Sequence, residues 1–119
     1  MSVHFYDFLG APIAYTNDGI HIYRFNGEPV AYVYGPSVYG FSGRHLGWFE
    51  NGLIRDNRGS TVFFTPGFTG GPMKPIPQIA PIKRIRQIKP IKHTRAMRPM
   101  KPMKTSSWSQ LNSDTFFAG

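Results

Sequence analysis

Four short segments, each centred on a glycine, repeat through the first half of the chain. Aligned on Gly10, Gly27, Gly43 and Gly59, they read "FYDFLGAPIAY", "IYRFNGEPVAY", "VYGFSGRHLGW" and "IRDNRGSTVFF". The glycines are 17, 16 and 16 residues apart, and an aromatic residue stands five positions after each of them. Self-similarity at a nearly constant spacing indicates a repeat architecture.

Turn signals separate the repeats and divide each of them in two. "NDG", "YGP" and "ENG" stand between the glycine-centred segments, so the chain reverses about every eight residues. This spacing predicts an all-β fold of about eight short antiparallel strands. An open sheet of this size would leave two unpaired edges, so we expect the strands to close into a shallow barrel with pseudo-four-fold symmetry, filled by side chains.

The alternation within each repeat predicts which residues face inward. A two-residue hairpin loop ending on the glycine, as the pair Asn26-Gly27 favours, places Tyr6 opposite Ile13. One face then carries Tyr6, Ile13, Tyr15 and their equivalents, including Trp48, and the other carries Phe5 and its equivalents. We expect the aromatic face to fill the barrel interior.

A basic segment with a period of three follows the repeats. Residues 72–104 contain ten Lys or Arg and no acid, and they account for the net charge of +8. From Met73 to Met103 every third residue but Thr94 is Ile or Met, the next residue is usually basic, and the third column is rich in proline. A polyproline II helix has three residues per turn, so these columns predict an apolar, a basic and a proline edge.

The length of this arm suggests that it extends away from the repeats. At about 3.1 Å per residue it would reach roughly 95 Å, so we expect that it cannot all pack on its own domain. The alternative is a disordered, solvated linker of biased composition. We therefore divide the chain into a barrel (1–67), a basic Pro/Ile/Met-rich arm (68–104) and a short apolar motif (105–119).

The apolar motif contains Trp108, Leu111, Phe116 and Phe117. It is interpreted either as a docking peptide, which needs a partner, or as a short closing helix, which needs only the barrel. Because every repeat lies before residue 72, residues 1–71 are expected to fold alone.

The most specific stretch, "GRHLGWFENGLIRDNRG" at residues 43–59, resembles the bacterial 4-fold beta flower domain. The matching motif residues are His45, Leu46, Gly47, Trp48 and Asp56, and the resemblance covers roughly residues 3–67. It implies a shallow four-petalled β-barrel, similar in form to tubby-like and scramblase-like folds, in a family with no established activity. In the fourth repeat Arg55 and Asn57 replace the aromatic pair.

Candidate ligand-binding residues cluster in this stretch: Arg44, His45, Trp48, Arg55 and Asp56. A general base would need a nucleophile and an orienting partner. The simpler hypothesis is that His45 and Asp56 bond to one another or to backbone groups at a turn, and that Arg44 pairs with Glu28. The histidine spacings fit no metal motif, and no thiolate site exists without cysteine, so no metal or cofactor is expected.

The function favoured by these patterns is non-enzymatic binding. We expect the arm to associate with an anionic surface, most simply a membrane face, because an aliphatic edge adds a hydrophobic term. The basic residues assigned to this surface are Lys83, Arg84, Arg86, Lys89, Lys92, Arg95, Arg98, Lys101 and Lys104. Alternatives are nucleic-acid binding, although the arm has no aromatic residue for stacking, and protein interaction or homo-oligomerisation through the arm. The first thirty residues lack a signal-peptide pattern, so a cytoplasmic location is expected.

Overall fold

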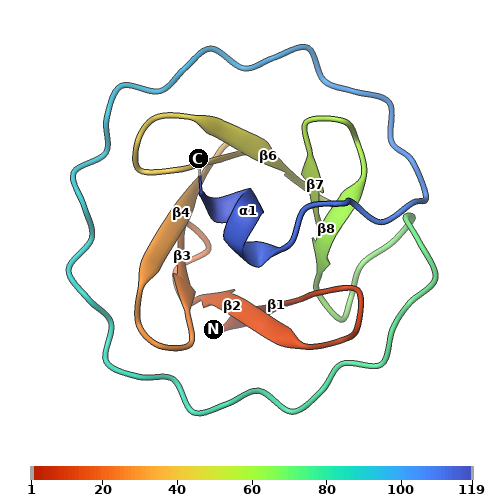
Figure 1. Cartoon of the computed structure of the whole chain (residues 1–119), viewed down its shortest axis with the longest axis horizontal. Coiled ribbons are helices and arrows are strands. Elements are labelled where there is room, and N and C mark those ends of the chain that lie inside the picture. Colours follow the sequence, from red (N-terminus) through yellow and green to blue (C-terminus); the bar gives the residue numbers. More distant parts are fainter. Residues whose placement is uncertain (1, 119) are drawn as a thin grey trace.

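The expected all-β architecture is confirmed by a computed structural model, which describes residues 2–118. Eight antiparallel strands follow one another around a closed barrel, and β1 pairs with β8 through Tyr6 and Phe64 to complete it (Figure 1). The strands are β1 (Val3–Tyr6), β2 (Pro12–Thr16), β3 (His21–Arg24), β4 (Pro29–Tyr34), β5 (Ser37–Tyr39), β6 (His45–Glu50), β7 (Leu53–Asp56) and β8 (Thr61–Phe64). We call the four hairpins petals 1 to 4, each formed by two consecutive strands.

The turn at the tip of each petal has three residues, not two. In petal 1 the amide of Gly10 donates to the carbonyl of Asp7, and the amide of Asp7 donates to the carbonyl of Ala11, both at 2.9 Å. The four repeat glycines have φ between +82° and +97°, as three-residue hairpin loops with a glycine bulge require. The expected two-residue loop at Asn26-Gly27 is therefore wrong. The Asn-Gly pair with positive φ at both residues is Asn51-Gly52, which joins β6 to β7.

The prediction that the aromatic face fills the barrel is also wrong. Each hairpin has a register shift beside its turn, so Phe5 pairs with Ala14 but Tyr6 pairs with Pro12. The bulge moves only the residues next to the turn, and the face that carries Phe5, not the face that carries Tyr6, fills the barrel. The fully buried residues of the central core are Phe5, Ala14, Ile22, Ala31, Val38, Ile54 and Phe63.

The tyrosines instead stack between neighbouring petals, outside the central core. Tyr15 lies against Tyr23 with ring centroids 5.9 Å apart, and Tyr32 lies against Tyr39 at 6.0 Å. They are nevertheless 0 to 7% exposed, in clusters separate from the core. A second layer must therefore cover the outside of the barrel.

That layer is the basic arm, which we call the girdle (residues 73–104). It contains neither helix nor strand and runs around the barrel, past petals 1 to 4 in order (Figure 1). Its amides bond to the petal tips at a spacing of nine residues: Gln78 to Gly10, Gln87 to Gly27 and Ala96 to Gly43, at 2.8 to 2.9 Å, with Thr105 to Gly59 at 3.2 Å. The expectation that the arm cannot pack on its own domain is thus contradicted.

The length of the girdle matches the circumference of the barrel. At about 3.1 Å per residue, nine residues of polyproline II span about 28 Å, close to the quarter circumference, about 27 Å, of a molecule 35 Å across. The arm is much longer than the barrel is wide, but it fits along the perimeter of the barrel.

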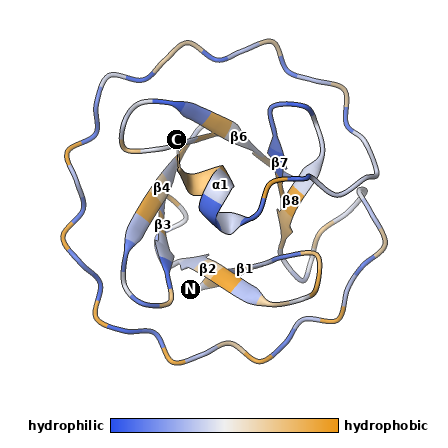
Figure 2. Cartoon of the chain, viewed as in Figure 1, coloured by the Kyte–Doolittle hydropathy of each residue, from blue (hydrophilic) through white to orange (hydrophobic). Residues whose placement is uncertain are grey.

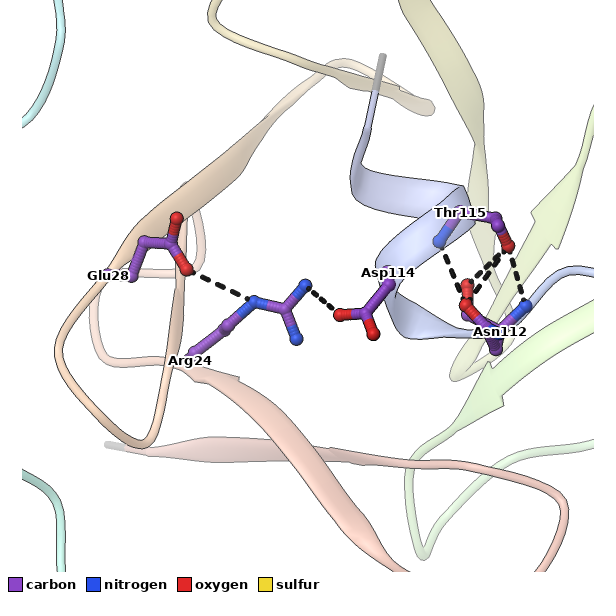
Figure 3. A network of polar contacts seen from close by, with 5 residues as sticks. All are labelled: Arg24, Glu28, Asn112, Asp114 and Thr115. Carbon is purple, nitrogen blue, oxygen red and sulfur yellow. Dashed lines mark hydrogen bonds and ion pairs between the residues drawn. The ribbon is translucent and has the colours of Figure 1, made fainter.

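The chain ends in helix α1 (Ser113–Phe117), which lies over the centre of the barrel (Figure 1). Its Phe116 is 3% exposed and belongs to the central core, where Gly47 leaves room for the ring. Asn112 caps the helix, and Asp114 lies 3.0 Å from Arg24 of petal 2 (Figure 3). Of the two interpretations of the apolar motif, the structure shows the closing helix.

Replacing Gly27 by Ala tests the contact between petal and girdle. A Cβ there would lie 2.0 Å from the carbonyl oxygen of Ile85, so the girdle must move and lose two backbone hydrogen bonds. We expect a loss of about 2 kcal/mol beyond the cost of the left-handed backbone. Gly19→Ala is the matched control, because Gly19 has φ +76° and open space around its Cα. Urea unfolding that gives equal losses for the two variants would contradict the contact.

Candidate functional site

The five predicted ligand-binding residues divide between two places. Arg44, His45 and Asp56 line a cavity of about 660 Å³ between the tips of petals 3 and 4, the segment 107–111 and α1. Trp48 and Arg55 do not line it. They form a cross-strand pair on the outer face of the barrel, under the girdle.

Arg55 occupies the position that a tyrosine has in the other three petals, and its hydrogen bonds stabilise the fold. Its guanidinium donates hydrogen bonds of 2.6 Å to the carbonyls of Gly59 and Thr105, which ties the end of the girdle to petal 4. Burial lowers the pKa of Arg55 from its ordinary value. Trp48 is covered by Lys101, whose ammonium lies 5.7 Å from its ring centroid. Both residues thus contribute to the packing of the girdle on the barrel.

His45 lies in a hydrogen-bonded chain with Ser37 and Asn57. Its Nε2 is 3.0 Å from the Ser37 hydroxyl, and its Nδ1 is 2.9 Å from the Asn57 side-chain oxygen. A serine, a histidine and an orienting side chain in this order could activate a nucleophile. However, Ser37 is 0% exposed and does not line the cavity, so its hydroxyl is not accessible to a substrate in this structure.

The burial of His45 predicts a pH dependence of stability. Desolvation lowers the pKa of His45 below its ordinary value of 6.5. Just below pH 6.5, the histidine is therefore protonated more in the unfolded chain than in the folded chain. We expect the free energy of unfolding to fall as the pH drops from about 7.5 to about 5.5, and His45→Gln to reduce that fall. Urea unfolding at both pH values measures it. An unchanged fall in the variant would assign the effect to other groups, such as His4.

Asp56 bonds to backbone groups of its own turn, as one of the predictions stated. Its Oδ1 accepts from the amides of Arg58 and Ser60 at 2.9 and 3.0 Å, and its Oδ2 accepts from the Ser109 hydroxyl at 2.6 Å. It does not bond to His45. The predicted partner of Arg44 is also wrong, because Glu28 pairs with Arg24 at 3.3 Å.

The girdle offers a second candidate surface. Its six isoleucines are 84 to 97% exposed, and its methionines at 73, 97, 100 and 103 are 87 to 94% exposed. Hydrophobic and hydrophilic residues alternate all around it (Figure 2). A continuous series of exposed aliphatic side chains on so small a protein marks an interaction surface.

The basic residues assigned to the anionic surface have two roles in the structure. Lys83 and Lys92 lie 4.6 Å above the rings of Tyr15 and Tyr32. Three further cations lie over the rings of Tyr23, Tyr34 and Trp48; they are Arg86, Arg95 and Lys101, respectively. The guanidinium of Arg98 donates a hydrogen bond to the Tyr34 carbonyl. Within residues 2–118, the side chains of Arg84, Lys89 and Lys104 have no hydrogen bond, ion pair or ring contact. These three are the cations that the fold does not use.

A second repeat, with a period of nine residues, runs through the girdle. The stretches "QIAPIK", "QIKPIK" and "AMRPMK" begin at residues 78, 87 and 96, nine residues apart. In each stretch the first residue donates its amide to a petal glycine, and the final lysine covers an aromatic ring. The predicted period of three is contained in this period of nine, which matches the four petals and was not part of the prediction.

Other classes of site find no support in the residues that the structure describes. Residues 2–118 contain no group of three His, Cys, Asp or Glu side chains that could hold a metal ion. Among the same residues, no helix has the length and apolar character needed to span a membrane.

Comparison with known proteins identifies one family. The family model described as "4-fold beta flower protein" matches residues 3–117, so the match includes the girdle and α1 and extends well beyond the repeats. Neither the curated proteins nor the solved structures gave a match. The chain therefore belongs to the 4-fold beta flower family, whose function is unknown.

Proposed function

We propose that this protein is a non-enzymatic module that binds the anionic, cytoplasmic face of a membrane through its girdle. The observation that supports the proposal is the exposure of the aliphatic column, 84 to 97% for the isoleucines, beside ten basic residues and no acid. Each cation near an anionic bilayer contributes about 1 kcal/mol, and aliphatic side chains add a hydrophobic term on insertion.

Charge also favours a lipid surface over another copy of the protein. Two girdles that met edge to edge would bring positive residues together, and like charges across an interface oppose binding. Nucleic acid would attract the cations, but phosphate neutralisation gains nothing from exposed isoleucines.

The shape of the molecule favours contact along one arc. The molecule is a disc of 35 × 35 × 24 Å, and a flat bilayer meets the edge of a disc over only part of its perimeter. The arc from Ile79 to Ile91 contains five of the six isoleucines of the girdle, and it includes Arg84 and Lys89, two of the cations that the fold does not use. We assign the membrane contact to this arc.

Flotation with vesicles containing phosphatidylserine tests the proposal. Replacing Ile79, Ile82, Ile85, Ile88 and Ile91 by Ser should weaken binding at least tenfold, about 1.4 kcal/mol, while every cation remains. The fold should be unaffected, because these side chains are exposed. The matched control replaces Met97, Met100 and Met103 by Ser, on the remaining arc, and should change binding less than about twofold.

Two results would contradict this account. Unchanged binding by the isoleucine variant would leave charge as the only attraction and would end the membrane proposal. An equal loss in the methionine variant would show that the contact is not confined to the assigned arc. Replacing Arg84 and Lys89 by Gln should also reduce binding to anionic vesicles, with no effect on vesicles of phosphatidylcholine alone.

A further inference from the structure

The cavity between petals 3 and 4 is not used by the girdle or by the proposed membrane contact. Its volume of about 660 Å³ lies within the range of small-molecule sites. Four parts of the chain build it: the tips of petals 3 and 4, the segment 107–111 and α1. Two backbone hydrogen bonds hold the segment against β8. The amide of Thr61 donates to the carbonyl of Ser107, and the amide of Ser109 donates to the carbonyl of Thr61.

Two cationic side chains line the cavity. Arg44 and Arg58 both line it, and within residues 2–118 neither guanidinium has an ion pair or a hydrogen bond. The single carboxylate in the lining, Asp56, is already bonded to two turn amides and to Ser109. The burial of His45 lowers its pKa and so favours its neutral form. The site therefore carries one positive charge in excess.

Another part of the lining is apolar. Trp108, Leu111 and Phe116 line the cavity, and Phe8 extends this wall, with its ring centroid 6.3 Å from that of Trp108. Phe8 and Leu111 are 57 and 42% exposed, so the apolar wall is open to an incoming molecule.

We infer that this cavity binds an aromatic monocarboxylate. The ring would lie against Trp108 and Leu111, and the carboxylate would accept hydrogen bonds from Arg44 and Arg58, whose planar guanidinium groups suit a carboxylate. A single negative charge matches the single excess positive charge, whereas a dianion would meet the carboxylate of Asp56. This inference does not depend on the membrane proposal.

The test uses the full-length protein labelled with ¹⁵N and titrated with 2-naphthoate. The indole N–H resonance of Trp108 should shift and saturate with a Kd of about 1 mM or tighter, the affinity expected for a ligand of this size. The backbone amide of Gln87, which bonds to Gly27 at the tip of petal 2, is an internal control, and its resonance should not shift. The neutral isostere 2-naphthamide should bind at least tenfold more weakly.

Variants separate the site from general attraction to a basic protein. Arg44→Gln combined with Arg58→Gln should weaken 2-naphthoate binding at least tenfold, and the fold should remain because both side chains are exposed. Arg84→Gln combined with Lys89→Gln removes the same charge from the girdle and should change the affinity less than twofold. Absence of saturable binding, equal affinity for 2-naphthamide, or an equal loss in the two double variants would overturn the inference.

Discussion

Truncation after residue 71 is expected to leave the chain without a cooperative thermal transition. The shortened chain would lack Phe116 in the central core, Trp108 beside Phe64, and the Thr105 carbonyl that accepts from Arg55. It would also expose the tyrosine stacks that the girdle covers. A domain of about 70 residues has only a few kcal/mol of stability to lose, so these losses together exceed it.

This expectation reverses the one drawn from the repeats alone. Circular dichroism during heating measures it, with the full chain as the reference. If residues 1–71 alone retained a β-type spectrum and melted cooperatively, the girdle and α1 would be accessories to a complete barrel.

Phe116→Ala is expected to destabilise the full chain by about 3 to 5 kcal/mol, the usual cost of removing a fully buried phenylalanine. Its ring is 3% exposed and lies 5.5 Å, centroid to centroid, from that of Phe63. The site cannot collapse easily, because the surrounding strands are held by the closed barrel.

Leu111→Ala is the control for this substitution, since Leu111 lies in the same apolar motif (105–119) but is 42% exposed. It should cost less than about 0.5 kcal/mol. Urea unfolding of both variants measures the difference, and similar small losses would mean that α1 does not close the core.

The sequence predicted the number of strands, their order and their closure because these depend on local signals. Each repeat carries its own turn residues and its own hydrophobic pattern, and short antiparallel strands of this size leave few arrangements. Helix α1 was one of two stated alternatives, since a segment with Phe116 and Phe117 can serve a partner or its own barrel equally well.

The interior face was predicted wrongly because both faces of the strands are apolar, so hydrophobicity could not distinguish them. Phe5 and Ile22 do lie on the face opposite to Tyr6 and Tyr23, but it is the face of Phe5 that fills the barrel. The bulge beside each turn then adds residues such as Val30 and Leu46 to this interior. The strands can be apolar on both faces because the inner face forms the core and the girdle covers the outer face.

The candidate site was predicted in part. Arg44, His45 and Asp56 do meet at one cavity, because adjacent petal tips bring residues of the third and fourth repeats together. Trp48 and Arg55 point to the other face, again because of the pleat. Trp108 and Leu111 complete the cavity from about fifty residues away, and no local pattern shows such a contact.

Site-resolved amide hydrogen exchange of the full chain tests the docked girdle most directly. The account predicts slow exchange at the residues whose amides bond to the petals: Gln78, Arg84, Gln87, His93, Ala96 and Thr105. Fast exchange is predicted between them, at the exposed isoleucines 79, 82, 85, 88 and 91, because exposed amides without a hydrogen-bond acceptor exchange readily. Uniformly fast exchange from residue 73 to residue 104 would contradict the account and would show a disordered linker.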